Sequence, residues 1–272
     1  MKVLVTGGAG YIGSHTILEL VELGFTSIFS VDCFLNSTGD TFRRIEQICG
    51  VKIKNFSTDL SQLQEVEKLF AAEKFDVVIH FAALKSVPES VDKPTEYYRN
   101  NLNSLINVLD CMHKSGVNKL IFSSSCSVYG NPSVLPVTEE EPFGIAESPY
   151  AHTKQIGEEI IKSFCNAHPE FKSVSLRYFN PAGAHSSALI GEEVTERPNN
   201  LVPLITQTAV GIREKLTVFG KDYNTKDGTC IRDYIHVSDI ANAHVKAINF
   251  LEESQENYSV INLGSGEGTT RS

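Results

Sequence analysis

The sequence predicts an α/β protein with a doubly wound, mostly parallel sheet. Short apolar runs rich in β-branched residues alternate along the chain with longer segments of helical periodicity, and residues 2–6 and 11–23 form the first such pair. Residues 75–81 are apolar almost throughout, which is typical of a strand buried on both faces. Because parallel strands are joined by crossovers, usually helices, this alternation indicates a sheet covered by helices on both sides.

A glycine-rich turn joins the first strand to the first helix. In such a turn one glycine permits the tight bend, one lets the backbone approach a phosphate and one lets the helix pack closely on the strand, because a side chain would be in the way. Gly7, Gly10 and Gly13 have the spacing for these positions. The amide groups of Tyr11 and Ile12 would face an anion at the positive end of the helix dipole. The turn therefore predicts a site for the pyrophosphate of a dinucleotide.

The second strand, residues 27–31, is followed by an acidic residue that refines this prediction. Asp32 lies about 20 residues beyond the last glycine, which is the spacing found in dinucleotide-binding folds. Its carboxylate would accept hydrogen bonds from a ribose 2′-hydroxyl and repel a 2′-phosphate. We therefore expect NAD rather than NADP; the structural alternative is a glycine turn followed by a solvated aspartate.

Composition argues against several other classes of protein. The chain has 272 residues, a formal net charge of −9 and no basic run longer than a pair, which disfavours a nucleic-acid-binding surface. Its six cysteines lack metal-binding spacing, so we expect reduced thiols, no metal site and a cytoplasmic protein. The chain opens on a strand and has no long apolar run, which argues against secretion and membrane insertion.

Candidate ligand contacts follow several predicted strands, at the edge where a doubly wound sheet binds ligands. Asp59 could contact an adenine amino group or instead cap a helix at residues 61–72. Lys85, which follows the small residues Ala82 and Ala83, could reach a ribose or phosphate or be a solvated loop lysine.

Two further candidates lie in the middle of the chain. Asn100, in a helix expected at residues 94–115, could bridge to the cofactor or have a capping or surface role. The strand expected at residues 119–122 is followed by a run of serines that ends at Ser125. These serines would bring hydroxyl groups to the ligand-binding edge of the sheet.

The helix that begins after Ser148 carries a candidate catalytic pair. Ser148 is a favoured N-cap residue and Pro149 a favoured first helical residue. Tyr150 and Lys154 are spaced i to i+4 and share one face, which we expect to differ from the apolar stripe with Ile160 and Ile161. A neighbouring ammonium favours a phenolate, so Tyr150 could act as a base; an exposed pair without a catalytic role is the alternative.

These motifs resemble those of the extended short-chain dehydrogenase/reductase family and, within it, of the UDP-galactose 4-epimerases. The likeness rests on the following segments: TGGAGYIG at 6–13, the strand ending at Ser125, YxxxK at 150–154, HFAALKSVPES at 80–90, LRYFNPAGAH at 176–185, PNNLVP at 198–203 and DGTCIRDYIHVSD at 227–239. It covers nearly the whole chain, and the last three segments belong to the nucleotide-sugar lobe of that family.

The resemblance implies a Rossmann domain over residues 1–178 that binds NAD and a smaller, interleaved lobe over residues 179–272 that binds a UDP-sugar. It implies reversible epimerisation at C4 of UDP-galactose and UDP-glucose through a 4-keto intermediate, with tightly bound NAD. It also implies a homodimer that pairs through two helices, at about residues 93–115 and 149–167.

The resemblance also assigns roles to the positions that match the family motifs. The implied catalytic residues are Ser125, Tyr150 and Lys154. Besides the glycine turn, the implied NAD site comprises Asp32, Asn36, Ser37, Asp59, Leu60, Phe81, Ala82, Ala83, Lys85, Asn100 and Phe179. The implied UDP-sugar site comprises Asn180, Asn200, Leu201, Phe219 and Arg232. On chemical grounds Arg232 suits a diphosphate, because its planar guanidinium matches phosphate oxygens.

The chain departs from the family pattern in two places. Cys33 stands where the family usually has a polar residue, and we expect a modest effect on NAD affinity. The lobe is expected to be truncated, because relatives continue beyond Ser272. One alternative is therefore a non-catalytic dinucleotide-binding protein. Another is a related enzyme such as a nucleotide-sugar dehydratase, which Cys126 and Ser127 disfavour because they stand where dehydratases carry a carboxylate pair.

Overall fold

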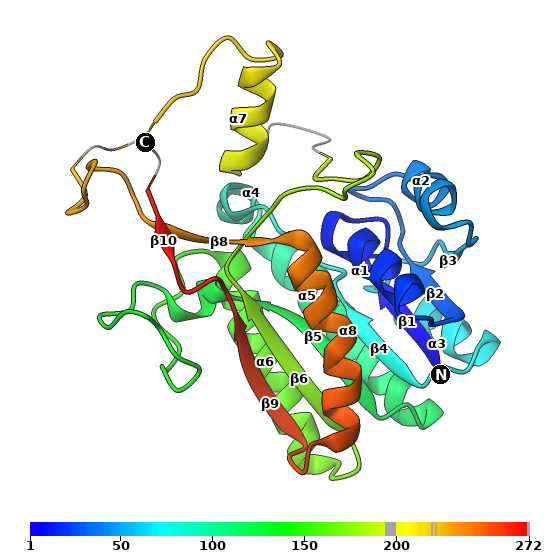
Figure 1. The fold of residues 1–272 in the computed structure, drawn as a ribbon. Coiled ribbons are helices and arrows are strands. Elements are labelled where there is room, and N and C mark those ends of the chain that lie inside the picture. Colours follow the sequence, from blue (N-terminus) through cyan, green and yellow to red (C-terminus); the bar gives the residue numbers. More distant parts are fainter. Residues whose placement is uncertain (194–199, 219, 221, 271–272) are drawn as a thin grey trace.

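The computed structural model describes residues 1–193, 200–218, 220 and 222–270, and its centre is a seven-stranded sheet (Figure 1). The strands of this main sheet are β1 Lys2–Thr6, β2 Ser27–Val31, β3 Lys54–Phe56, β4 Val77–His80, β5 Lys119–Ser125, β6 Lys172–Tyr178 and β9 Tyr258–Leu263. They lie in the order β3-β2-β1-β4-β5-β6-β9, and every neighbouring pair is parallel. The order reverses between β1 and β4, so the predicted doubly wound fold is confirmed.

Helices cover both faces of this sheet. The helices of the described residues are α1 Tyr11–Glu22, α2 Asp40–Cys49, α3 Leu63–Ala72, α4 Val87–Asp92, α5 Pro94–Ser115, α6 Pro149–Ala167, α7 Leu201–Ala209 and α8 Val237–Glu253, with a 3-10 helix at Cys126–Tyr129. The helices α1, α2 and α8 share one hydrophobic core, and α3, α5 and α6 share the other. Figure 1 shows α1 and α8 side by side in front of the sheet. None of the helices described here is long and apolar enough to cross a membrane.

Strand residues alternate between the two cores. Val77 and Ile79 of β4 pack in the core with α1 and α8, whereas Val78 between them packs in the core with α5 and α6. All of β4 is buried, as its apolar run predicts. Since each face meets a helical layer, the strand has no polar side.

A second, three-stranded sheet is formed by strands that come after β6 in the chain. It consists of β7 Asn180–Ala182, β8 Arg232–His236 and β10 Gly268–Thr269 in the order β10-β8-β7, and α7 stands apart from the two helical layers (Figure 1). After β8 the chain returns to the main sheet through α8 and β9. After residue 178 the chain thus passes from the main sheet to the small one and back again.

Several local predictions differ from the structure. Strand β5 continues to Ser125 instead of ending at residue 122. The short helix α4 was not predicted; the Ser86 side chain caps it by accepting a hydrogen bond from the Glu89 amide. A helix of six residues is too short for helical periodicity to be visible in the sequence.

Candidate active site

A long cleft lies between the carboxyl edge of the main sheet and the residues of the lobe. Its volume is about 2470 Å³, well above the roughly 300–1,000 Å³ of an ordinary small-molecule pocket, so it has room for more than one ligand. The predicted site residues that line it are Gly7, Gly10, Tyr11, Ile12, Gly13, Asp32, Asn36, Ser37, Asp59, Leu60, Phe81, Ala82, Ala83, Lys85, Asn100, Ser125, Tyr150, Lys154, Phe179, Asn180, Asn200 and Arg232. Leu201 begins α7 without lining the cleft, and Phe219 lies outside the described residues.

The glycine turn at one end of the cleft has no room for side chains. Gly7 has a φ of +69°, and a Cβ there would lie 2.9 Å from the amide nitrogen of Ala82. A Cβ on Gly13 would collide with the carbonyl oxygen of Gly7. Helix α1 begins directly after the turn with no side-chain cap and no acidic residue in its first turn. Its first amide groups are thus left for an anion in the cleft, which is the arrangement that a pyrophosphate requires.

Asp32 lies beside this turn and connects it to the loop after β2. One carboxylate oxygen accepts a hydrogen bond from the Ala9 amide at 3.0 Å. The other accepts from the Phe34 amide at 2.9 Å and from the Ser37 hydroxyl at 2.8 Å. The carboxylate is half-buried at the wall of the cleft, where it meets the predicted requirement for a ribose acceptor.

The structure bears on one of the two alternatives for Asp59, the helix cap. Its Oδ1 accepts a hydrogen bond from the Ser61 amide at 2.9 Å, but α3 begins only at Leu63 and has Gln62 as its N-cap residue. The capping alternative is therefore wrong, and the Asp59 side chain lines the cleft.

The loop that carries Lys85 is fixed from behind by a buried asparagine. The Asn101 side chain accepts from the Leu84 amide at 2.8 Å and donates to the Leu84 carbonyl at 3.0 Å. Its neighbour Asn100 lines the cleft instead. Adjacent asparagines of α5 therefore have different positions, one in the core and one at the candidate cofactor site.

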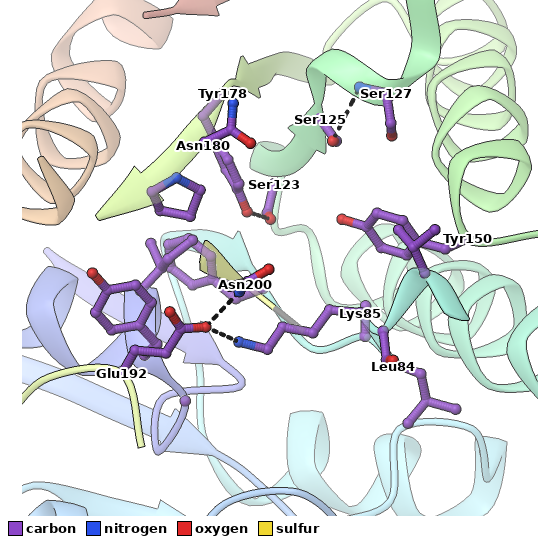
Figure 2. Close-up of a pocket in the computed structure, with 18 of the residues that line it drawn as sticks. Leu84, Lys85, Ser123, Ser125, Ser127, Tyr150, Tyr178, Asn180, Glu192 and Asn200 are labelled. Atoms are coloured by element: carbon purple, nitrogen blue, oxygen red, sulfur yellow. Dashed lines mark hydrogen bonds and ion pairs between the residues drawn. The ribbon is translucent and has the colours of Figure 1, made fainter. Parts of the chain in front are cut away.

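Tyr150 and Ser125 face the same part of the cleft, as Figure 2 shows. Desolvation in this narrow space raises the pKa of Tyr150 above its ordinary value of 10.0, and proximity to Tyr178 adds to the rise. A hydrogen bond with Ser125 acts in the opposite direction without reversing the shift. The protein groups alone therefore hold Tyr150 in its neutral form.

Lys154 lies beneath Tyr150 and is almost fully buried. Its ammonium donates to the Ser123 carbonyl at 2.6 Å and lies 5.8 Å from the centre of the Tyr150 ring. Burial lowers the pKa of Lys154 to about 8. Desolvation of the phenol therefore outweighs the effect of this neighbouring ammonium on the pKa of Tyr150.

The buried face of α6 also differs from the prediction. Lys154 shares that face with Glu158 and Ile161, whereas Ile160 is only half-buried. The expected separation between the lysine and the isoleucine stripe is therefore wrong. Charged side chains on a buried helix face require groups of opposite charge nearby, and Glu158 supplies a negative charge on the face that carries Lys154.

Glu158 is at the centre of a buried polar network behind the candidate catalytic residues. Its carboxylate accepts hydrogen bonds from the Arg177 guanidinium, with the shortest N–O distance 2.7 Å, and from the Ser124 hydroxyl. Arg177 also donates to the Tyr129 hydroxyl at 2.8 Å. The network joins α6 to β5 and β6, and so it fixes the helix that carries Tyr150 against the strand that carries Ser125.

The opposite wall of the cleft belongs to the lobe. Asn180 donates to the backbone carbonyl of Asp233 at 2.8 Å, which joins β7 to β8. Arg232 is exposed at the start of β8, and its guanidinium donates to the Ile231 carbonyl at 2.8 Å. Asn180, Asn200 and Arg232 line the cleft and Leu201 does not, so the structure brings together three of the residues predicted for a nucleotide sugar.

Comparison with known proteins agrees with this geometry. The model for the NAD dependent epimerase/dehydratase family matches residues 3–264. The chain belongs to this family. It is 47% identical over 268 residues to a UDP-glucose 4-epimerase of Yersinia enterocolitica, covering 98% of this chain and 79% of that protein. It is also 47% identical over 273 residues to a UDP-glucose 4-epimerase of Homo sapiens, covering 98% and 78%.

Solved structures of epimerases are similar over the same span. A UDP-glucose 4-epimerase from Bifidobacterium longum in complex with NAD+ and UDP has a TM-score of 0.94 and 46% sequence identity, covering 99% of this chain and 80% of that one. A UDP-glucose-4-epimerase from Stenotrophomonas maltophila with bound NAD and formylated UDP-arabinopyranose has a TM-score of 0.95 and 43% identity, with the same coverage. The family resemblance inferred from the sequence motifs is thus confirmed.

Tyr178 and Glu192 are among the cleft residues that the sequence did not predict, and each contacts another residue of the cleft. Tyr178 ends β6, and its hydroxyl group hydrogen-bonds to that of Ser123; its place at the end of a strand was the available signal. Glu192 accepts a hydrogen bond from Asn200 at 2.7 Å and lies 3.4 Å from the Lys85 ammonium (Figure 2). Glu192 lies in a segment without periodicity or motif, so no sequence signal indicated it.

Proposed function

We propose that this chain catalyses the reversible epimerisation of UDP-galactose and UDP-glucose at C4, with tightly held NAD. The observation that carries this proposal is the position of Tyr150 and Ser125, which face one another between a dinucleotide-binding turn and a wall with Arg232. The names of the relatives and the ligands of the Bifidobacterium structure support the same activity.

The glycine turn and Asp32 would hold NAD, with the pyrophosphate at the start of α1 and a ribose at the carboxylate. Phe81 to Ala83, Lys85 and Asn100 would line the rest of the cofactor, which runs toward Tyr150. NAD supplies the redox chemistry, because it accepts a hydride from C4 of the sugar and later returns it. The protein supplies position and electrostatic field.

Tyr150 would remove the proton from the sugar 4-hydroxyl, and Ser125 would hydrogen-bond to the same oxygen. Burial opposes the phenolate, so Tyr150 needs a positive charge besides Lys154. The oxidised nicotinamide carries such a charge, and in a desolvated cleft a nearby cation favours the phenolate. Tyr150 would therefore become a base only when the oxidised cofactor is in place.

The lobe would hold the UDP part of the substrate while the sugar turns. Arg232 suits the diphosphate, and Asn180 and Asn200 offer amide groups at the same wall; Leu201 and Phe219 complete the proposed set. The 4-keto sugar would rotate about its diphosphate link and present its other face. The hydride would then return with inverted configuration at C4, so no net oxidation occurs.

We also propose a cytoplasmic homodimer. The helices α5 and α6 pack side by side, and Ile106 of α5 is 39% exposed while Ile156 of α6 is half-buried. Pairing these helices with a second copy would cover such apolar residues. Sedimentation of the purified chain tests this part separately.

The direct test is interconversion of UDP-galactose and UDP-glucose by the purified chain, followed by NMR of the sugar protons. We expect turnover, and we expect Tyr150→Phe to lower kcat at least about 100-fold, because it removes the proton-transferring group. NAD binding should persist in that variant. Tyr98→Phe is a matched control, since Tyr98 is half-buried on α5, does not line the cleft and hydrogen-bonds to His152 at 2.8 Å.

A folded chain that binds NAD but converts neither sugar would contradict the epimerase proposal and leave the non-catalytic alternative. A 6-deoxy-4-keto product would instead indicate a dehydratase. The structure disfavours that chemistry, because burial raises the pKa of Cys126 beside Ser125 to about 11 and the thiol is a poor acid–base group at neutral pH.

A further inference from the structure

Three potential metal ligands meet at the edge of the main sheet opposite the cleft. His113 lies in the last turn of α5, and His168 and Glu170 lie just after α6. One ligand atom from each side chain lies within 4.8 Å of the other two. Because α5 and α6 end where β5 and β6 begin, whereas Ser125 is at the carboxyl end of β5, the cluster is separate from the candidate active site.

The two imidazole rings are oriented by a shared aromatic neighbour. The Phe164 ring lies 6.1 Å from the His113 ring and 4.5 Å from the His168 ring, between ring centres. The two histidine rings lie 4.1 Å from each other. Such packing limits the rotamers of both side chains, so fewer conformations are lost when they bind a common ion.

The turn that carries His168 and Glu170 is anchored at both ends. The His168 amide donates to the Phe164 carbonyl at 3.0 Å, and the Phe171 amide donates to the His168 carbonyl at 2.9 Å. The Phe171 side chain is 2% exposed and belongs to the core of α5 and α6. The Glu170 carboxylate extends from this fixed turn to 4.0 Å from His168 Nδ1.

The local charge favours a cation. Two helices end at the cluster, and the carboxyl end of each helix carries a partial negative charge. Two imidazoles and one carboxylate are the ligands of open zinc sites, whereas calcium and magnesium prefer sites made of oxygen atoms alone. His113 and Glu170 are exposed, which gives an ion access to the cluster from solvent.

We propose that His113, His168 and Glu170 bind a divalent transition-metal ion of the zinc type, with water completing its coordination. The ion joins the end of α5 to the end of α6 and stabilises the folded chain without entering the cleft. The spacing of the cysteines predicted no metal site. No spacing in the sequence indicates this cluster, because His113 lies in the last turn of α5 and His168 just after α6.

The test is zinc binding by the full chain, prepared without a histidine tag and stripped with EDTA. Calorimetric titration with ZnCl₂ should show one site, and zinc should raise the unfolding midpoint. His113→Gln and Glu170→Gln should each weaken zinc binding at least about tenfold, the smallest loss expected when a metal site is disturbed. His152→Gln, which changes a histidine on another part of α6, should bind zinc as the natural chain does.

The proposal is overturned if the natural chain binds no zinc, or if a His113→Gln/His168→Gln double variant binds it with unchanged affinity. Cobalt provides a second readout, because its visible absorption depends on its ligands. The natural chain should give a ligand-field spectrum that the double variant lacks, and identical spectra would place the ion elsewhere. None of these measurements uses a sugar nucleotide, so failure of the epimerase proposal leaves this test intact.

Discussion

The two walls of the cleft are held in different ways. On the cofactor side, the Gly7 amide bonds to the Val31 carbonyl at 2.8 Å, and the turn is continuous with buried strands of the main sheet. On the lobe side, α7 buries only Pro203, and β8 is exposed at both ends. The cofactor wall is therefore part of the core, whereas the lobe wall can change its ligand contacts at little cost in stability.

The largest loss of stability on the core side of the cleft is expected when one partner of the buried Arg177–Glu158 ion pair is removed. Arg177→Met would leave the Glu158 carboxylate buried without its cation, which costs about 3–5 kcal/mol. Urea unfolding should show this loss. Lys114→Met is the control: Lys114 and Glu67 form an exposed pair, so the change should cost at most about 1 kcal/mol. Equal effects would contradict the contrast between core and surface.

A substitution with a smaller effect should weaken cofactor binding and leave UDP binding by the lobe unchanged. Gly13→Ala forces a Cβ against the Gly7 carbonyl, and such overpacking costs about 1–3 kcal/mol. We expect NAD affinity, measured by fluorescence titration, to fall about tenfold while UDP still binds. Gly39→Ala should change neither, because the nearest atom to a Cβ there is 3.7 Å away in the Phe34 side chain. Equal loss of both ligands would indicate general unfolding.

Acid should destabilise the cofactor wall through its buried histidines. Burial lowers the pKa of His80 to about 3 and that of His244 to about 4, from 6.5. Below pH 6.5 these histidines are protonated in the unfolded chain but stay neutral in the folded chain. The free energy of unfolding therefore decreases as pH falls from 6.5 toward 4. Each such histidine contributes up to about 1.4 kcal/mol per pH unit.

His244→Gln should make this pH dependence shallower, as measured by urea unfolding at a series of pH values. The comparison concerns slopes, so an overall loss of stability in the variant does not affect it. An unchanged slope would show that His244 is not a source of the acid sensitivity.

The smallest effect is expected on the lobe wall. Arg232→Lys keeps the charge but removes the planar fork, which should cost about 1 kcal/mol of diphosphate binding, or about fivefold in KM for the UDP-sugar. Because Arg232 is exposed, stability should stay within about 0.5 kcal/mol. A larger loss of stability would mean that the lobe is as tightly coupled to the core as the cofactor wall is.

The sequence by itself determined the doubly wound fold, the glycine turn with Asp32, and the helix start that places Tyr150. Each depends on spacing within one strand–helix unit, where local geometry leaves few alternatives. The family motifs added the lobe residues, and most of those described line the cleft.

Only the tertiary structure decided the rest. Several side-chain pairs join residues that are distant in the sequence, and no local sequence pattern indicates such pairs. They are Lys85 with Glu192, Glu158 with Arg177 and His113 with His168. The direction of the Tyr150 pKa shift was also beyond the sequence. It depends on how completely the surrounding elements exclude water from the phenol, and desolvation is a property of the packed fold rather than of the helix that carries the residue.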